Sequence, residues 1–198
     1  MSQAGLQVER QGGLLILTID RDARRNALDS ATSAALDAAI ASGEADDQIS
    51  VIILTGAGER AFCSGMDLKE AAEIGAGGGL LANGFGGITQ RRRTKPLIAA
   101  VNGAAIAGGF EIALACDIVV AADHAMFGLS EVKRGMFAFA GGIQRLARTV
   151  PRQTALALIL TAEPLPAVRL YELGLVSEVV PGSDVLPRAL AIGAMIAG

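Results

Sequence analysis

Short apolar runs and segments of helical periodicity alternate along the chain. Strands are predicted by the apolar runs at residues 14–19, 50–55, 97–101 and 118–122, and by shorter runs near 60–63 and 176–180. Helices are predicted at residues 31–40, 68–73, 143–149, 151–160 and 185–198, and from Gly108 onward. Strands that alternate with helices indicate an α/β architecture, and the length favours a single domain.

Glycine interrupts this pattern most densely between residues 75 and 87. Seven glycines fall in this stretch: Gly75, Gly77, Gly78, Gly79, Gly84, Gly86 and Gly87. Such a composition predicts a mobile loop, which we expect to flank a pocket.

Two stretches share the order strand, glycine turn and helix start, one at residues 62–68 and one at 107–111. A helix start has free N–H groups and the positive end of the helix dipole. If the two turns face each other, the N–H groups of Met66 and Gly108 converge on one oxygen, which suits a developing oxyanion. The alternative is that Gly108 and Gly109 serve only close packing, that Glu111 only complements the dipole and that Asp67 caps the next helix.

Two glutamates could add acid–base chemistry to this site. Glu111 lies in the first turn of the predicted helix, and Glu131 follows the next strand, twenty residues later. Two carboxyl groups in an apolar pocket can divide into an acid and a base, because the ionisation of each raises the pKa of the other. A glutamate in a loop is more often simply solvated, so the spacing leaves both interpretations open.

Five ordered motifs resemble the crotonase superfamily, and within it the enoyl-CoA hydratases. They are Arg25-Asn-Ala-Leu28, Arg60-Ala-Phe-Cys-Ser-Gly-Met-Asp-Leu68, Val101-Asn-Gly-Ala-Ala-Ile-Ala-Gly-Gly-Phe-Glu111, Phe127-Gly-Leu-Ser-Glu-Val132 and Gly141-Gly-Ile-Gln-Arg-Leu146. The resemblance extends from about residue 14 to residue 180. It implies a spiral of ββα repeats with a core at about residues 10–182, and a C-terminal helical region that starts at 183–198 and is truncated.

The resemblance also implies a reaction and a set of site residues. Water would add across the double bond of a trans-2-enoyl-CoA to give a 3-hydroxyacyl-CoA, as in fatty acid metabolism, without a metal or any cofactor beyond the CoA of the substrate. Glu111 and Glu131 match the catalytic glutamates, the first activating water and the second protonating C2, and the N–H groups of Met66 and Gly108 match the oxyanion hole. Residues that match or adjoin substrate and CoA contacts are Ala23, Arg25, Met66, Asp67, Leu68, Lys69, Gly108 and Phe139.

Three departures from the typical hydratase pattern keep other crotonase reactions and a non-catalytic acyl-CoA-binding protein as alternatives. The stretch Met136-Phe-Ala-Phe-Ala140 replaces a typical Pro-Gly, and Phe139 stands where a small residue is usual. Ser130 replaces a common proline before the second glutamate. The third departure is the short C-terminal region.

The composition of the chain limits the kinds of partner and location that we expect for the protein. Of the 198 residues 52% are hydrophobic, and the mean hydropathy is +0.46, which favours an oligomer. The resemblance to the crotonase superfamily implies that this oligomer is a trimer or a dimer of trimers. A net charge of −3 argues against nucleic-acid binding. The cluster Arg91-Arg92-Arg93 with Lys95 is most simply a solvated helix end. The N-terminus does not resemble a signal peptide, and no apolar run is long enough to span a membrane, so we expect a cytoplasmic protein.

Cysteine and histidine are scarce, which limits the chemistry available. Cys63 and Cys116 lie in apolar segments and are predicted to be buried free thiols. The single histidine, His124, leaves no zinc site. A serine hydrolase using Ser64 and His124 lacks the G-x-S-x-G elbow. Residues 56–61 spell the dinucleotide-binding pattern G-x-G-x-x-A, but a second turn follows instead of a helix.

Overall fold

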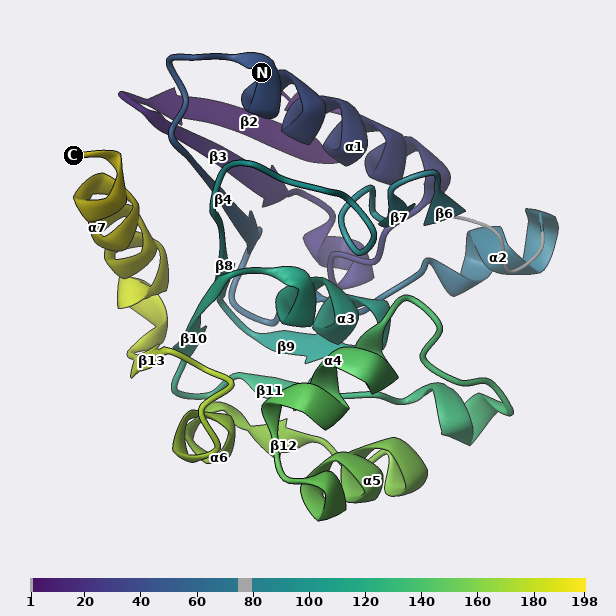
Figure 1. Cartoon of the computed structure of the whole chain (residues 1–198). Helices are drawn as coiled ribbons and strands as arrows, with labels where there is room; N and C mark the ends of the chain where they lie inside the picture. The colour runs from purple at the N-terminus through teal and green to yellow at the C-terminus, as the bar shows by residue number, and fades with distance from the viewer. Residues whose placement is uncertain (1, 75–79) are drawn as a thin grey trace.

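The computed structural model describes residues 2–74 and 80–198, and these form two main sheets, a small hairpin and surrounding helices (Figure 1). The larger sheet has the order β1-β2-β3-β4-β8-β10-β13. Its strands are β1 Ser2–Gln3, β2 Leu6–Gln11, β3 Leu14–Ile19, β4 Val51–Gly56, β8 Leu97–Val101, β10 Ile118–Ala122 and β13 Glu178–Val180. From β3 to β13 every neighbouring pair is parallel, whereas β1, β2 and β3 pair antiparallel.

The smaller sheet has the order β12-β11-β9-β5. Its strands are β5 Ala61–Cys63, β9 Ala104–Ile106, β11 Met126–Gly128 and β12 Leu165–Pro166. Strands β5, β9 and β11 are parallel to one another, so their carboxyl ends lie at one edge of the sheet.

Helices connect and cover the sheets. The α-helices are α1 Ser30–Ala45, α2 Leu68–Ile74, α3 Gly108–Ala115, α4 Gly142–Thr149, α5 Arg152–Thr161, α6 Ala167–Glu172 and α7 Val185–Ala197, and the 3₁₀-helices are η1 Asp22–Arg24, η2 Glu131–Arg134 and η3 Gly182–Asp184. The order β4-β5-α2, β8-β9-α3 and β10-β11-η2 repeats one unit three times. Each unit gives one strand to each sheet and then a helix, as the ββα spiral predicted from the sequence requires.

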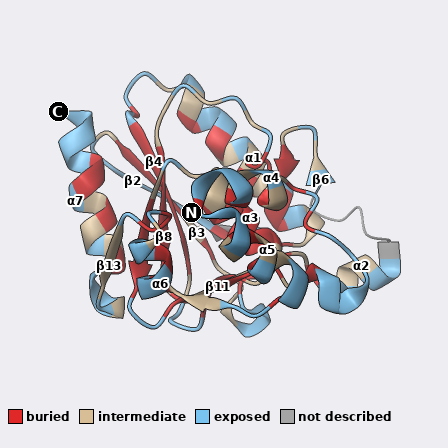
Figure 2. Ribbon diagram, turned by 60° about the horizontal axis from the view of Figure 1, so that its bottom comes forward, coloured by how far each residue is buried: buried red, intermediate tan, exposed pale blue. Residues whose placement is uncertain are grey.

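Helices α1 and α7 cover opposite faces of the larger sheet. A Cβ added at Gly43 of α1 would lie 2.6 Å from the Leu15 side chain, whereas one added at Gly193 of α7 would lie 3.1 Å from that of Leu14. Successive side chains of a strand point to opposite faces, so the two helices lie on either side of β3. The strands between them are consequently buried on both faces, as the red ribbons of Figure 2 show.

Most predicted elements are confirmed within one or two residues, and the differences have physical causes. The sequence did not indicate β2, because this outer strand buries only its first residue and is otherwise polar. Of the predicted glycine loop, residues 75–79 lie outside the described residues. The remainder is not a plain loop: β6 Leu80–Leu81 and β7 Gly84–Phe85 form a hairpin, and Phe85 is buried.

The arginine cluster was also interpreted incorrectly as a solvated helix end. Arg91 pairs with Asp37 on α1, and Arg93 pairs with Asp117 and donates to the Ala115 carbonyl at 2.8 Å. These side chains therefore tie the segment before β8 to α1 and to the end of α3. Within the described residues, no helix is long and apolar enough to cross a membrane.

Candidate active site

The site forms where strands β5, β9 and β11 end. Met66 lies in the turn after β5, Gly108 and Glu111 lie at the start of α3 after β9, and Glu131 begins η2 after β11. The residues that follow the smaller-sheet strand in each of the three repeats thus lie at one edge of that sheet. Neighbouring carboxyl ends of parallel strands are a common location for ligand sites in α/β proteins.

The turns after β5 and β9 approach closely because their glycines have no side chain. A Cβ at Gly109 would lie 1.9 Å from the carbonyl oxygen of Cys63, so only glycine fits there. Gly65 has a φ of +92°, and a Cβ on it would lie 3.1 Å from the Gly108 nitrogen. The Met66 turn and the start of α3 are therefore in direct contact, as the hypothesis of facing turns requires.

The N–H groups of Met66 and Gly108 are both available to a ligand. Among the hydrogen bonds within residues 2–74 and 80–198, none uses either N–H as a donor. Gly108 is buried and begins α3, where the first N–H groups have no partner within the helix. Both residues line the same cavity, which has a volume of about 570 Å³.

Glu111 is a buried residue of the cavity lining. Its side chain is on the first turn of α3, the residue is only 3% exposed, and Oε1 accepts a hydrogen bond of 2.8 Å from the backbone N–H of Gly142. Burial raises the pKa of Glu111 to about 7, the hydrogen bond from Gly142 opposes this, and the charge of Glu131 adds to it. A carboxyl group with this pKa exchanges protons readily near neutral pH.

Glu131 faces the same cavity from η2. It is 8% exposed, and its Oε2 atom has no hydrogen-bond partner among the described residues. Burial also raises the pKa of Glu131, opposed by a bond to its own backbone and by the charge of Arg134. A buried carboxyl oxygen without a partner is rare in folded proteins and is typical of a functional site.

The structure brings together nearly all the residues that the sequence suggested for the site. Glu111, Glu131, Met66, Gly108, Arg25, Asp67, Leu68, Lys69 and Phe139 all line the cavity. Ala23 is exposed on η1 and does not line it; its neighbour Arg24 does. The carboxylate of Asp67 is already engaged, because it accepts from Lys69 N–H at 3.0 Å as a helix cap and from Arg21 at 3.0 Å.

The cavity lining has a cationic and an apolar part. The cations are Arg24, Arg25, Lys69, Lys133 and Arg134, and the larger apolar side chains are Met66, Leu68, Phe85, Ile106, Met136 and Phe139. Phe139 is 41% exposed and packs edge to face on Phe137, with ring centroids 6.4 Å apart. Such a lining suits a ligand with an anionic portion and an apolar portion.

Gly142 and Arg145 are the supporting residues whose roles the sequence did not reveal. A Cβ on Gly142 would lie 2.9 Å from Oε1 of Glu111, so glycine is needed for this contact. Arg145 donates to the carbonyl groups of Ala140 and Thr89 and holds the turn before α4. The sequence showed the Gly141-Gly142 pair before a helix, but it did not show that Gly142 contacts Glu111.

The alternative chemistries find no support in the geometry. The G-x-G-x-x-A stretch leads into β5 and not into a helix. Ser64 lines the cavity, but His124 does not: its ring contacts Asp123 and the Glu59 carbonyl, each at 3.2 Å. Cys63 is a buried free thiol as predicted, whereas Cys116 is only partly buried. No group of three or more His, Cys, Asp or Glu side chains in the described part of the chain is arranged to hold a metal ion.

Comparison with known proteins agrees with this geometry. Residues 9–198 match the family described as Enoyl-CoA hydratase/isomerase. A mevalonyl-coenzyme A hydratase of Aspergillus fumigatus is 41% identical, covering 92% of this chain and 68% of its own. A short-chain-enoyl-CoA hydratase of Clostridium acetobutylicum is 40% identical, with coverage of 93% and 72%. A crystal structure of an enoyl-CoA hydratase from Mycobacterium tuberculosis has a TM-score of 0.92 and 43% identity, covering 98% of this chain and 76% of that one.

These likenesses confirm the crotonase-like α/β fold that the five motifs predicted. The chain belongs to the enoyl-CoA hydratase/isomerase family.

Proposed function

We propose that this protein is an enoyl-CoA hydratase, a hydro-lyase that adds water to a trans-2-enoyl-CoA. The observation that carries the proposal is the convergence of two buried carboxyl groups of raised pKa and two unpartnered N–H groups in one cavity. Relatives named as enoyl-CoA hydratases at about 40% identity support it. The reaction requires only water and the thioester, whose CoA is part of the substrate.

In this mechanism the two glutamates have opposite tasks. Ionised Glu111 accepts a proton from water as the water oxygen bonds to C3, and protonated Glu131 donates its proton to C2. A pKa of about 7 leaves Glu111 partly ionised near neutral pH, so it can accept this proton, and the raised pKa of Glu131 favours the protonated form of that group relative to an exposed glutamate. Unpartnered Oε2 of Glu131 is free to act on substrate or water.

The backbone donors stabilise the charge that this addition creates. As water adds, negative charge develops on the thioester oxygen, and the N–H groups of Met66 and Gly108 would bind that oxygen. The removal of one such donor typically lowers the rate by about 10²- to 10³-fold. The start of α3 adds the positive end of a helix dipole.

The cationic part of the lining would bind CoA. Arg24 lies in η1 and Arg25 directly follows it, Lys69 lies in α2, and Lys133 and Arg134 lie in η2, so three elements supply cations to the cavity lining. Guanidinium and ammonium groups are suitable partners for the phosphates of CoA. Phe139 and Met136 would contact the acyl chain, and Phe139→Ala is expected to shift the preference toward longer or bulkier acyl groups.

The test is the loss of conjugated enoyl-thioester absorbance when the protein is added to crotonyl-CoA or to a longer enoyl-CoA. Glu111→Gln and Glu131→Gln are each expected to lower turnover by about 10²-fold or more while binding persists. Glu172→Gln is the control, because this glutamate is exposed and pairs with Arg169 on α6.

The outcomes separate the candidate functions. Formation of the 3-hydroxyacyl-CoA supports the hydratase. A product with a shifted double bond and no added water would identify an isomerase of the same family. Tight binding of both thioesters without turnover would identify a non-catalytic acyl-CoA-binding protein.

We also propose that copies of this chain associate, as a trimer or a dimer of trimers. Large apolar side chains are exposed on three helices near the C-terminus: Leu160, Val168, Tyr171, Met195 and Ile196. Contact with another copy would remove such side chains from water, which favours association. Sedimentation equilibrium would give the number of copies, and a monomer at micromolar concentration would contradict the proposal.

A further inference from the structure

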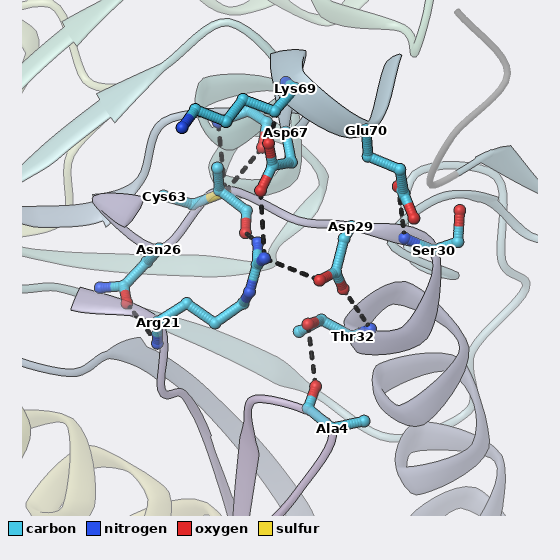
Figure 3. A network of polar contacts seen from close by, with 12 residues as sticks. Ala4, Arg21, Asn26, Asp29, Ser30, Thr32, Cys63, Asp67, Lys69 and Glu70 are labelled. Atoms are coloured by element: carbon cyan, nitrogen blue, oxygen red, sulfur yellow. Dashed lines mark hydrogen bonds and ion pairs between the residues drawn. The ribbon is translucent and has the colours of Figure 1, made fainter. Parts of the chain in front are cut away.

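Arg21 lies beside the site without lining the cavity. It precedes η1, and its side chain is only 16% exposed. Its Nη2 atom lies 2.7 Å from Asp29 Oδ2 and 3.0 Å from Asp67 Oδ2, and its Nη1 atom donates to the Ala27 carbonyl. Figure 3 shows the guanidinium between the two carboxylates.

Each of these carboxylates also caps the N-terminus of a helix. Asp29 accepts the N–H of Thr32 at 2.7 Å at the start of α1, and Asp67 accepts the N–H of Lys69 at 3.0 Å at the start of α2. Arg21 therefore fixes two helix starts relative to each other. One of them, Asp67, directly follows the proposed donor Met66.

A parallel β-bridge between Leu28 and Met66 also holds the backbone beside Asp67. Leu28 N–H donates to the Gly65 carbonyl at 2.8 Å, and Asp67 N–H donates to the Leu28 carbonyl at 2.9 Å. In an extended chain the N–H groups of successive residues point to opposite sides, so the Met66 N–H points away from Leu28.

Arg21 contacts both segments of this bridge. Ala27, whose carbonyl it binds, directly precedes Leu28, and Asp67 directly follows Met66. The guanidinium thus clamps the two segments at the bridge that orients the Met66 N–H. Its planar fork reaches three acceptors at once, which an ammonium group on a flexible stem does not reproduce.

We propose that Arg21 is a positioning residue that aims the Met66 N–H at the thioester oxygen by holding Asp67 and Ala27 in register. The inference rests on the proposed function, in which this N–H stabilises the developing oxyanion. It assigns Arg21 a part in the chemical step although Arg21 touches neither water nor substrate.

Steady-state kinetics of Arg21→Met and Arg21→Lys with crotonyl-CoA test this inference. We expect kcat to fall by about 10- to 100-fold in Arg21→Met, because small displacements of a preorganised donor lower the rate strongly. KM is expected to change by less than about threefold, since Arg21 itself does not line the cavity. The kcat of Arg21→Lys should be close to that of Arg21→Met.

The matched control is Arg93→Met. Arg93 is 11% exposed, pairs with Asp117 and binds a backbone carbonyl, as Arg21 does, but it lies outside the cavity lining. Its loss is expected to leave kcat unchanged at temperatures well below unfolding. An equal fall in kcat in both variants would show a general structural effect and would overturn the inference.

The absorption spectrum of a bound substrate analogue measures the hydrogen bond from the Met66 N–H more directly than the rate does. A conjugated arylacryloyl-CoA is expected to absorb at longer wavelength when bound, because N–H donors polarise its carbonyl group. Arg21→Met should reduce this red shift while the analogue still binds. If Arg21→Met does not fold, Asp67→Asn replaces it, since asparagine retains helix capping but loses the charge that Arg21 holds.

The double variant Arg21→Met with Asp67→Asn gives a further check. Because Arg21 acts through Asp67, we expect its kcat to be no lower than that of the more damaged single variant. Wild-type kcat and a wild-type red shift in Arg21→Met would overturn the inference and leave the proposed function intact. Absence of turnover in the unmodified protein would overturn the proposed function instead.

Discussion

Gly142 donates its backbone N–H to Oε1 of Glu111 at 2.8 Å, across 31 residues of sequence. The contact joins the start of α4 to the first turn of α3 and fixes one oxygen of the proposed base. The acid–base geometry of Glu111 therefore depends on a residue that supplies only a backbone group.

Gly142→Ala is expected to lower kcat by about 10- to 100-fold without unfolding the protein. The new Cβ would lie 2.9 Å from both Cγ and Oε1 of Glu111 and would displace that carboxylate. Alanine is otherwise favourable within a helix, and misplacement of a catalytic group by about 1 Å can lower a rate by about 10². Steady-state kinetics with crotonyl-CoA measure the effect. In the control Gly13→Ala the nearest atom lies 3.5 Å away, and unchanged kcat in both variants would contradict the prediction.

Glu111→Gln is expected to stabilise the protein at pH 8 while it removes activity. The native pKa of Glu111, about 7, exceeds its ordinary value of 4.5, so the folded state binds more protons than the unfolded state between these values. Stability from this group is full below pH 4.5 and is lost as pH rises through about 7. We compare the free energy of unfolding of the variant with that of the wild type at each pH. This difference should shift in favour of the variant by about 3 kcal/mol between pH 4.5 and pH 8. Urea unfolding at both pH values measures it, and an equal difference at both would contradict the prediction.

Asn26→Ala is expected to destabilise the fold by about 3 kcal/mol, because it leaves several buried groups without partners. Asn26 is fully buried, its amide donates to the carbonyls of Ala57 and Ala61, and its Oδ1 accepts the N–H of Arg21. Chemical denaturation measures the loss. Asn83→Ala, which removes one bond to Asp37 from a half-buried side chain, is the control and should lower stability by less than about 1 kcal/mol.

Ala107→Gly is expected to increase stability by about 1 kcal/mol. Ala107 precedes α3 with φ of 53° and ψ of −127°, a conformation that strains a residue with a Cβ. Glycine adopts it freely, and relief of about 1–3 kcal/mol exceeds the added chain entropy of about 0.4–1 kcal/mol. Thermal unfolding of the variant should occur at higher temperature. A lower unfolding temperature would show that the methyl group contributes more by packing than it loses in strain.

The sequence predicted the elements whose signals are local. The strands at 14–19 and 97–101 are continuous apolar runs, and the start of α3 has its own glycine signal, so each was identified from neighbouring residues alone. Glu111 and Glu131 were placed in one site through the resemblance, and the structure adds their burial and the unpartnered oxygen of Glu131.

The features that the sequence did not predict depend on contacts between distant segments. Gly142 acquires its role only when α4 packs against α3. The acceptors of Arg21 lie on two segments, at residues 27–29 and at Asp67, and no local pattern joins them. The hairpin at β6 and β7 was obscured by its glycines, one of which, Gly84, has a φ of +83° at the start of β7. Strand β2 carries too few buried side chains for hydrophobic alternation to reveal it.

The proposed oxyanion donors are backbone groups that follow neighbouring parallel strands, β5 and β9. Replacement of the Met66 side chain alone would leave the donor in place, so this position tolerates a change of residue type better than a change of chain length. One residue inserted between Cys63 and Met66 would move the donor by about 3.3 Å and turn its N–H to the opposite side. Sequence variation at this part of the site is therefore limited more strictly in length than in identity.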